Sequence, residues 1–145
     1  MYERLSSRAQ TIVRLANDIA REYGQEYVGT EHVLLAVLRE GTGIGARLLA
    51  ERNITEARLK AEIDELIESS MEETWVFGRL PGSPHYRNVV ATAIEQAQQL
   101  ESREVCSEHL LLALLKEKGS VAQSALDKLG IKHVDIRRAV AEAAA

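Results

Sequence analysis

The chain has 145 residues, of which 46% are hydrophobic and 28% charged, and its formal net charge is −4. These values are typical of one globular domain and argue against general nucleic-acid binding, which depends on clustered Lys and Arg. No apolar run approaches the roughly 20 residues that cross a bilayer, and the start lacks the apolar core of a secretory signal. We therefore expect a cytoplasmic protein that binds neither membranes nor nucleic acid.

The sequence repeats itself at a constant offset. Thr30-Glu31-His32 returns as Ser107-Glu108-His109, which is a shift of 77 positions. The apolar pattern recurs at the same shift: Val13 and Val90, Ala16 and Ala93, Leu49 and Leu126, Leu59 and Ile136, Ile63 and Val140. Because the match extends over many helical turns, we infer a duplicated unit.

The first helix of each unit is predicted by an apolar stripe with the i, i+3, i+4, i+7 spacing of an amphipathic helix. Ser6 and Ser83 precede the two stripes as candidate N-caps, and Pro84 stands at a first-turn position that tolerates proline. The second helix begins after Thr30 or Ser107 and is apolar on nearly every side. We expect it to be the buried central helix of its unit.

Glycines then precede a short third helix, and a fourth helix is predicted to start at Thr55. Ile54 and Leu59 have the spacing of a hydrophobic staple, which Ile131 and Ile136 repeat. No convincing strand pattern occurs. The fold class is therefore all-α, a tandem pseudo-symmetric repeat of two four-helix units.

The expected domain covers residues 1–145, with repeat one at 1–68, a linker at 69–82 and repeat two at 83–145. The linker contains Trp75-Val76-Phe77. Since buried aromatic residues usually belong to a core, we expect this segment to pack across the helices rather than to meet a partner.

These motifs resemble the Clp N-terminal domain of the ClpA/ClpC-type unfoldases, and most closely the ClpC-type members. Ser6-Ser7-Arg8-Ala9 is similar to the opening of that repeat, and Gly29-Thr30-Glu31-His32 to its Gly-Thr-Glu-His motif. Leu80-Pro81-Gly82-Ser83-Pro84 is similar to the segment that opens the second repeat. The resemblance implies a domain that recognises protein substrates and adaptor proteins and passes them to a Clp ATPase ring.

The ring itself is not in this sequence, because no phosphate loop of the form G-x-x-x-x-G-K-[ST] occurs. We therefore expect no enzyme activity and no cofactor. The chain is then either the front end of a longer unfoldase or a free-standing accessory protein that docks on a Clp protease core. A third, unrelated hypothesis is a thiol-dependent enzyme that uses Cys106.

The resemblance also implies phosphoarginine binding, since some ClpC-type domains bind this tag once per repeat through the motif glutamate. Those glutamates are Glu31 and Glu108 here, and paired hydrogen bonds to a guanidinium suit a carboxylate. The helix starts near Ser6 and Ser83 would suit the phosphate, and Arg8 would add a positive charge.

The second repeat departs from the family pattern. It has Ser83-Pro84-His85-Tyr86 where the family has Thr-Pro-Arg-Ala, and Cys106 where the first repeat has Gly29. These departures favour the first repeat as the phosphoarginine site.

His32 and His109 could be mistaken for metal ligands. They lack the spacing of a helical metal pair, so we expect hydrogen-bonded histidines at helix starts and no metal site. Cys106 is the single cysteine and lies beside a helix start, which favours a thiolate, but no oriented base or oxyanion site can be identified from the sequence.

Overall fold

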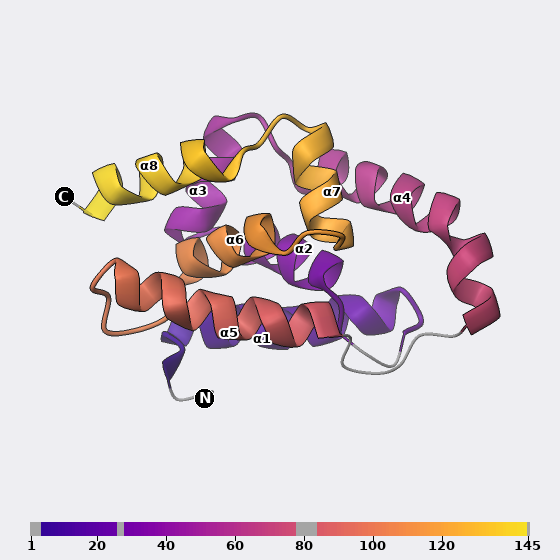
Figure 1. Cartoon of the computed structure of the whole chain (residues 1–145), viewed down its shortest axis with the longest axis horizontal. Coiled ribbons are helices and arrows are strands. Elements are labelled where there is room, and N and C mark those ends of the chain that lie inside the picture. Colours follow the sequence, from indigo (N-terminus) through magenta and orange to yellow (C-terminus); the bar gives the residue numbers. More distant parts are fainter. Residues whose placement is uncertain (1–3, 26–27, 78–83, 145) are drawn as a thin grey trace.

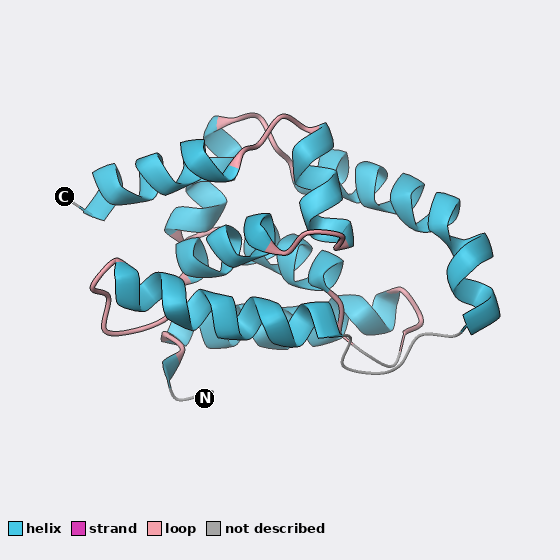
Figure 2. Cartoon of the chain, in the orientation of Figure 1, coloured by secondary structure: helices cyan, strands magenta, loops and turns pink. Residues whose placement is uncertain are grey.

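The computed structural model describes residues 4–25, 28–77 and 84–144, and of these only the backbone for 68–77, 84 and 144. Within these ranges the chain forms eight helices and no strand (Figures 1 and 2). They are α1 (Ser7–Glu22), α2 (Thr30–Glu40), α3 (Ile44–Glu51), α4 (Glu56–Phe77), α5 (Pro84–Gln99), α6 (Ser107–Lys116), α7 (Val121–Lys128) and α8 (His133–Ala144). The predicted all-α fold of two four-helix units is confirmed. No helix in the described part of the chain is both long and apolar enough to span a membrane.

The predicted linker and the Ser83 cap fall largely outside this description. Helix α4 continues through Phe77, so the first part of the 69–82 segment is helical. Ser83 and residues 78–82 lie outside the described residues, and the packing of the Trp75-Val76-Phe77 side chains stays a prediction.

Helix α1 begins where its sequence predicts. The Ser6 hydroxyl accepts a hydrogen bond from the Ala9 N–H at 3.1 Å, which confirms Ser6 as the N-cap. The apolar stripe is buried at Ala9, Ile12, Ala16, Ile19 and Ala20. Burial of this one face supplies the energy that holds a 16-residue helix against the core.

Helices α2 and α6 lie at the centre of the molecule, with α1 and α5 on one side and the remaining helices on the other (Figure 1). From Val33 to Val37 and from Leu110 to Leu115 every residue is buried. This confirms the expectation that the two most apolar helices are the central ones.

The two repeats share a single hydrophobic core. Helix α3 packs on α6 and α8, and α4 packs on α7, so helices of one repeat contact those of the other. Backbone conformation repeats as well as sequence. The left-handed residues Gly24 and Asn53 in the first repeat correspond, at the 77-residue shift, to Glu101 and Gly130 in the second.

A histidine in the first turn of α2 and of α6 caps the start of its own helix. The Nδ1 atom of His32 accepts a hydrogen bond from the Gly29 N–H, and that of His109 from the Cys106 N–H, both at 2.8 Å. The prediction of hydrogen-bonded helix-start histidines is confirmed. Each side chain satisfies a backbone donor that the first turn of a helix leaves without a partner.

The first residues of α2 and α6 cap helices of the opposite repeat. The Ser107 hydroxyl accepts from the Gly45 N–H of α3 at 3.0 Å, and the Thr30 hydroxyl accepts from the Ala122 N–H of α7 at 3.3 Å. These two contacts are equivalent under the 77-residue shift. They join the repeats through buried polar atoms rather than through apolar packing alone.

Candidate functional site

A short extended segment before α1 brings the two repeats together. Leu5 and Val105 form an isolated parallel bridge, in which Ser6 N–H donates to Val105 O at 2.9 Å and Val105 N–H donates to Arg4 O at 2.8 Å. The start of α1 therefore lies beside the segment that leads into α6. Because successive side chains of an extended segment point to opposite sides, Leu5 and Ser6 reach different pockets.

The first of these, which we call the polar pocket, has a volume of about 410 Å³. It is lined by Ser6, Ser7, Arg8, Ile44, Glu104, Cys106, Ser107 and Glu108. Two carboxylates and one guanidinium face the same space, together with the start of α1. The pocket thus combines residues of both repeats and can offer acceptors to a cationic group and donors to an anionic one.

The structure therefore pairs Ser6 and Arg8 with Glu108, whereas the sequence interpretation had placed them with Glu31 of their own repeat. Helix α1 has 16 residues and a length of about 24 Å, and α2 returns along it as in any helical hairpin. Glu31 consequently lies at the far end of α1, near Tyr23. Burial and the hydrogen bond to Asp64 raise the pKa of Tyr23, and the nearby charge of Glu31 adds to this effect. Glu31 is also almost fully buried, at 2% exposure, while Glu108 is half-buried.

Arg8 is held at the rim of the polar pocket by the end of α2. Its Nε atom donates to the Thr42 hydroxyl at 2.8 Å and lies 3.6 Å from Glu40 Oε2. In the second repeat, His85 replaces this arginine, and its Nδ1 lies 2.6 Å from Glu117 Oε2. Since Glu117 is the counterpart of Glu40, the substitution retains the pairing of the two helices even though the guanidinium is lost.

Cys106 has the environment of a weakly reactive thiol. Burial, together with the nearby charge of Glu108, raises the pKa of Cys106. The Nδ1 atom of the adjacent His109 accepts a hydrogen bond from the Cys106 backbone N–H, and within the described residues no hydrogen bond joins this imidazole to the sulfur. These features oppose thiolate chemistry at neutral pH.

Cys106, Glu108 and His109 also form a cluster in which potential metal-ligand atoms lie within 4.8 Å of one another. A metal ion bound at His109 Nδ1 would displace the hydrogen bond from the Cys106 N–H. If His109 keeps this hydrogen bond, Cys106 and Glu108 remain as ligands, and two protein ligands are fewer than the three or four of typical zinc sites. The capping role of His109 would therefore compete with a metal ion bound at Nδ1.

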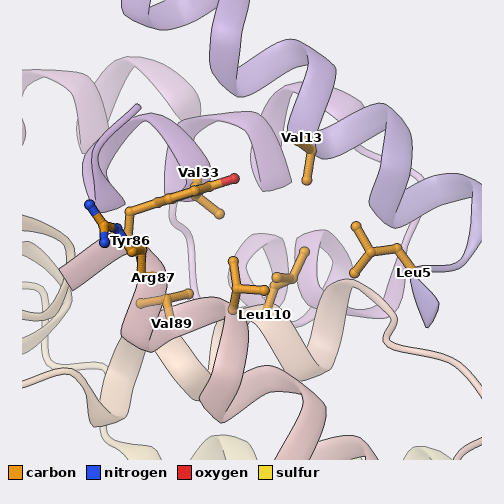
Figure 3. Close-up of a pocket in the computed structure, with 8 residues that line it drawn as sticks. Leu5, Val13, Val33, Tyr86, Arg87, Val89 and Leu110 are labelled. Atoms are coloured by element: carbon orange, nitrogen blue, oxygen red, sulfur yellow. The ribbon is translucent and has the colours of Figure 1, made fainter. Parts of the chain in front are cut away.

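The second pocket, which we call the seam pocket, is apolar and was not predicted from the sequence. It has a volume of about 410 Å³ and is lined by Leu5, Val13, Val33, Tyr86, Arg87, Val89, Val90 and Leu110. Figure 3 shows Val13 and Val33 of the first repeat and Val89 and Leu110 of the second around this pocket, with Leu5 from the segment before α1. Among the described residues that line it, Tyr86 and Arg87 have polar side chains and the others are apolar.

The seam pocket lies where equivalent positions of the repeats meet. Val13 and Val90 correspond under the 77-residue shift, as do Val33 and Leu110. Val33 and Leu110 are each 2% exposed, whereas Val13 and Val90 are only partly buried. The sequence signal for this pocket is Tyr86, which departs from the family pattern.

Comparison with known proteins places the chain in a family. It matches the family model described as the Clp repeat (R) N-terminal domain over residues 4–76 and 82–145, which are two successive copies. Chaperone protein ClpC1 of the chloroplast of Arabidopsis thaliana is 36% identical over 140 residues, covering 97% of this chain and 15% of that protein. A chloroplastic ClpA homolog of Brassica napus, an ATP-binding subunit of an ATP-dependent Clp protease, is also 36% identical and is covered to 16%. The chain thus spans about 15% of the length of these relatives.

Solved structures show the same fold. The N-terminal domain of the caseinolytic protease associated chaperone ClpD from Arabidopsis thaliana superposes with a TM-score of 0.73 at 20% identity, covering 96% of both chains. The N-terminal domain of the ClpV1 ATPase from E. coli gives a TM-score of 0.65 at 16% identity, covering 94% of this chain and 83% of that one. Since the family model matches most of the chain and ClpC1 is 36% identical over 97% of it, this chain belongs to the Clp N-terminal repeat family.

Proposed function

We propose that this chain is the substrate- and adaptor-binding module of a Clp-type unfoldase and delivers bound protein to an ATPase ring. The observation that carries the proposal is the seam pocket, an open cavity lined mainly by apolar side chains from both repeats. Apolar concave sites with a few polar groups are the usual form of a binding site. An unfolded segment exposes the apolar side chains that such a pocket would shelter from water.

The proposal is tested by binding of reduced, carboxymethylated α-lactalbumin, a permanently unfolded protein, followed by fluorescence anisotropy. Val13→Asp places a charge in the seam pocket and is expected to weaken binding at least about tenfold, because an uncompensated charge is costly in an apolar site. Val134→Asp is the matched control, since Val134 is 61% exposed on α8 and does not line the pocket. Equal binding by wild type and both variants would exclude the seam pocket as the binding site.

We further propose that the polar pocket binds phosphoarginine through Glu108, with Ser6 and Arg8 near the phosphate. Three features support this assignment: the shared pocket, the half-buried Glu108 and the capped start of α1. Helix starts favour anions, and a carboxylate pairs well with a guanidinium. Glu31 with Ser83 remains the candidate for the other repeat.

Calorimetric titration with free phosphoarginine, with arginine as the control ligand, separates these assignments. Binding lost in Glu108→Ala and retained in Glu31→Ala would support the polar pocket. Binding lost only in Glu31→Ala would move the site to the other repeat. Absence of binding to the wild-type chain would refute phosphoarginine recognition and leave the seam-pocket proposal standing.

A further inference from the structure

Thr42 lies between Arg8 and Glu40 at the rim of the polar pocket. Its hydroxyl accepts a hydrogen bond from Arg8 Nε–H at 2.8 Å and donates one to Glu40 Oε2. The Thr42 N–H also donates to Glu40 Oε1, at 3.1 Å. Because a hydroxyl that donates to a carboxylate becomes a stronger acceptor, these three groups form a polarised chain that fixes the orientation of the guanidinium.

The way in which Arg8 is held leaves most of its donors unused. An arginine side chain has five N–H groups, one on Nε and four on the two terminal nitrogens. Within the described residues, the hydrogen bond from Nε to Thr42 is the one that this side chain makes. Glu40 Oε2 lies 3.6 Å from the same Nε atom, which is too far for a direct hydrogen bond. The terminal N–H groups of Arg8 are therefore available to a ligand of the polar pocket, which this residue lines.

The aliphatic stem of Arg8 is held by the next residue of the chain, Gly43. A Cβ atom added at Gly43 would lie 2.9 Å from Arg8 Cδ and 2.3 Å from Ser107 Oγ. The absence of a side chain at this position thus lets the stem pack directly on the backbone. Thr42 and Gly43 together fix both the head and the stem of the same arginine.

The second repeat lacks the hydroxyl that lies between the cation and the carboxylate. At the 77-residue shift, Gly119 takes the place of Thr42 and His85 that of Arg8. His85 Nδ1 lies 2.6 Å from Glu117 Oε2, so the imidazole and the carboxylate are in direct contact. Threonine and arginine thus occur together in one repeat, and glycine and histidine in the other.

We propose that Thr42 is a positioning residue of the polar pocket, which separates Arg8 from Glu40 and directs the terminal N–H groups of Arg8 to a phosphoryl oxygen. The inference rests on the proposed phosphoarginine site and specifies how its anion-binding half is built. A guanidinium that pairs directly with a carboxylate gives up donors and charge that a phosphoryl group would otherwise receive. The neutral hydroxyl of Thr42 prevents this pairing.

The test is calorimetric titration of phosphoarginine into wild type and variants, with their folding checked by circular dichroism. Thr42→Ala should weaken binding by about 2- to 12-fold, the effect of one hydrogen bond, because Arg8 can then pair directly with Glu40. Thr42→Ser retains the hydroxyl and should bind like wild type. Thr11→Ala is the matched control, since the Thr11 hydroxyl also accepts from an arginine, Arg14, at 3.1 Å but does not line the pocket. It should bind like wild type as well.

The double variant Glu40→Gln/Thr42→Ala separates positioning from damage to the local fold. It lacks the carboxylate that competes for Arg8, so it should recover most of the affinity that Thr42→Ala loses. A loss of affinity caused by local misfolding would not be repaired by this second substitution.

The outcomes distinguish this inference from the site beneath it. Binding that is lost in Glu108→Ala but undiminished in Thr42→Ala would overturn the role of Thr42 and leave the phosphoarginine site standing. Equal weakening in Thr42→Ala and Thr42→Ser, or no recovery in the double variant, would also overturn it. Absence of binding to the wild-type chain would refute the phosphoarginine site and this inference together.

Discussion

The hydrogen bond by which Ser107 caps α3 should contribute more to the free energy of unfolding than most others in the domain. Ser107 is 1% exposed, and its hydroxyl accepts the Gly45 N–H from the opposite repeat. The N-cap residue of α3 is Gly43, which has no side chain to take over this role. In Ser107→Ala the Gly45 N–H would be left buried without an acceptor. The cost of such a group is about 1–3 kcal/mol in the free energy of unfolding.

The equivalent contact in the other repeat provides an internal comparison. Thr30 accepts the Ala122 N–H at the longer distance of 3.3 Å. Helix α7 also has its own cap, because the Ser120 hydroxyl accepts the Gln123 N–H at 3.1 Å. Thr30→Val should therefore cost less than Ser107→Ala, about 0.5–1.5 kcal/mol. Thr30→Val is expected to be the less destabilising of the two variants because α7 has a second cap, Ser120, whereas α3 has none.

Urea unfolding followed by far-UV circular dichroism measures both effects, provided that the dependence on urea concentration is unchanged. Ser124→Ala on α7 is the control, since its side chain is only partly buried and caps nothing, and it should stay within about 0.5 kcal/mol of wild type. If Ser107→Ala is no less stable than Ser124→Ala, the contact between repeats does not stabilise the fold as argued.

Three further predictions concern single residues. Burial lowers the pKa of His109 and of His133, so the folded state binds fewer protons than the unfolded one. The stability that the two neutral histidines contribute is fully present above the ordinary histidine pKa of about 6.5, so the free energy of unfolding should fall as the pH is lowered from about 7 to about 5. In urea titrations His109→Asn should make this pH dependence less steep. An unchanged pH dependence would exclude His109 as one of its sources. Glu101 has φ +58°, a left-handed conformation that is strained for residues with a side chain, whereas its counterpart in the first repeat is Gly24. Glu101→Gly should therefore raise the free energy of unfolding by about 1 kcal/mol, measured by thermal unfolding. A lower free energy of unfolding would contradict strain at this residue. At neutral pH iodoacetamide should modify Cys106 more slowly than it modifies the thiol of free glutathione, because the pKa of Cys106 is raised. Faster modification of Cys106 would restore the thiol-enzyme hypothesis.

The fold could be predicted because each helix has its own local sequence signals and because the set of signals occurs twice in the chain. Ser6 caps α1, and the continuous apolar runs of α2 and α6 are buried, as the pattern indicates. A helix requires only its own apolar face and caps to be recognised. The 77-residue shift then gives the number of units without any knowledge of their packing.

The site could not be predicted to the same extent, because it depends on how the repeats interlock. The shift suggests self-contained units, each with its own Ser and Glu, and with Arg8 in the first unit alone. The bridge between Leu5 and Val105 instead carries Ser6 and Arg8 to Glu108. The length of α1, about 24 Å, separates Ser6 from Glu31. Apart from Tyr86, nothing in the sequence distinguishes the residues that line the seam pocket, since Val13 and Val90 look like ordinary core positions of two amphipathic helices.

The central claim, that the seam pocket receives unfolded protein, is tested most directly by methyl NMR. The wild-type chain, labelled at Leu and Val methyl groups, is titrated with carboxymethylated α-lactalbumin. The account predicts progressive shifts for Val13, Val33, Val90 and Leu110, with no change at the exposed Val134 of α8. Shifts confined to α8, or methyl signals of the pocket that stay fixed while binding proceeds elsewhere, would contradict it.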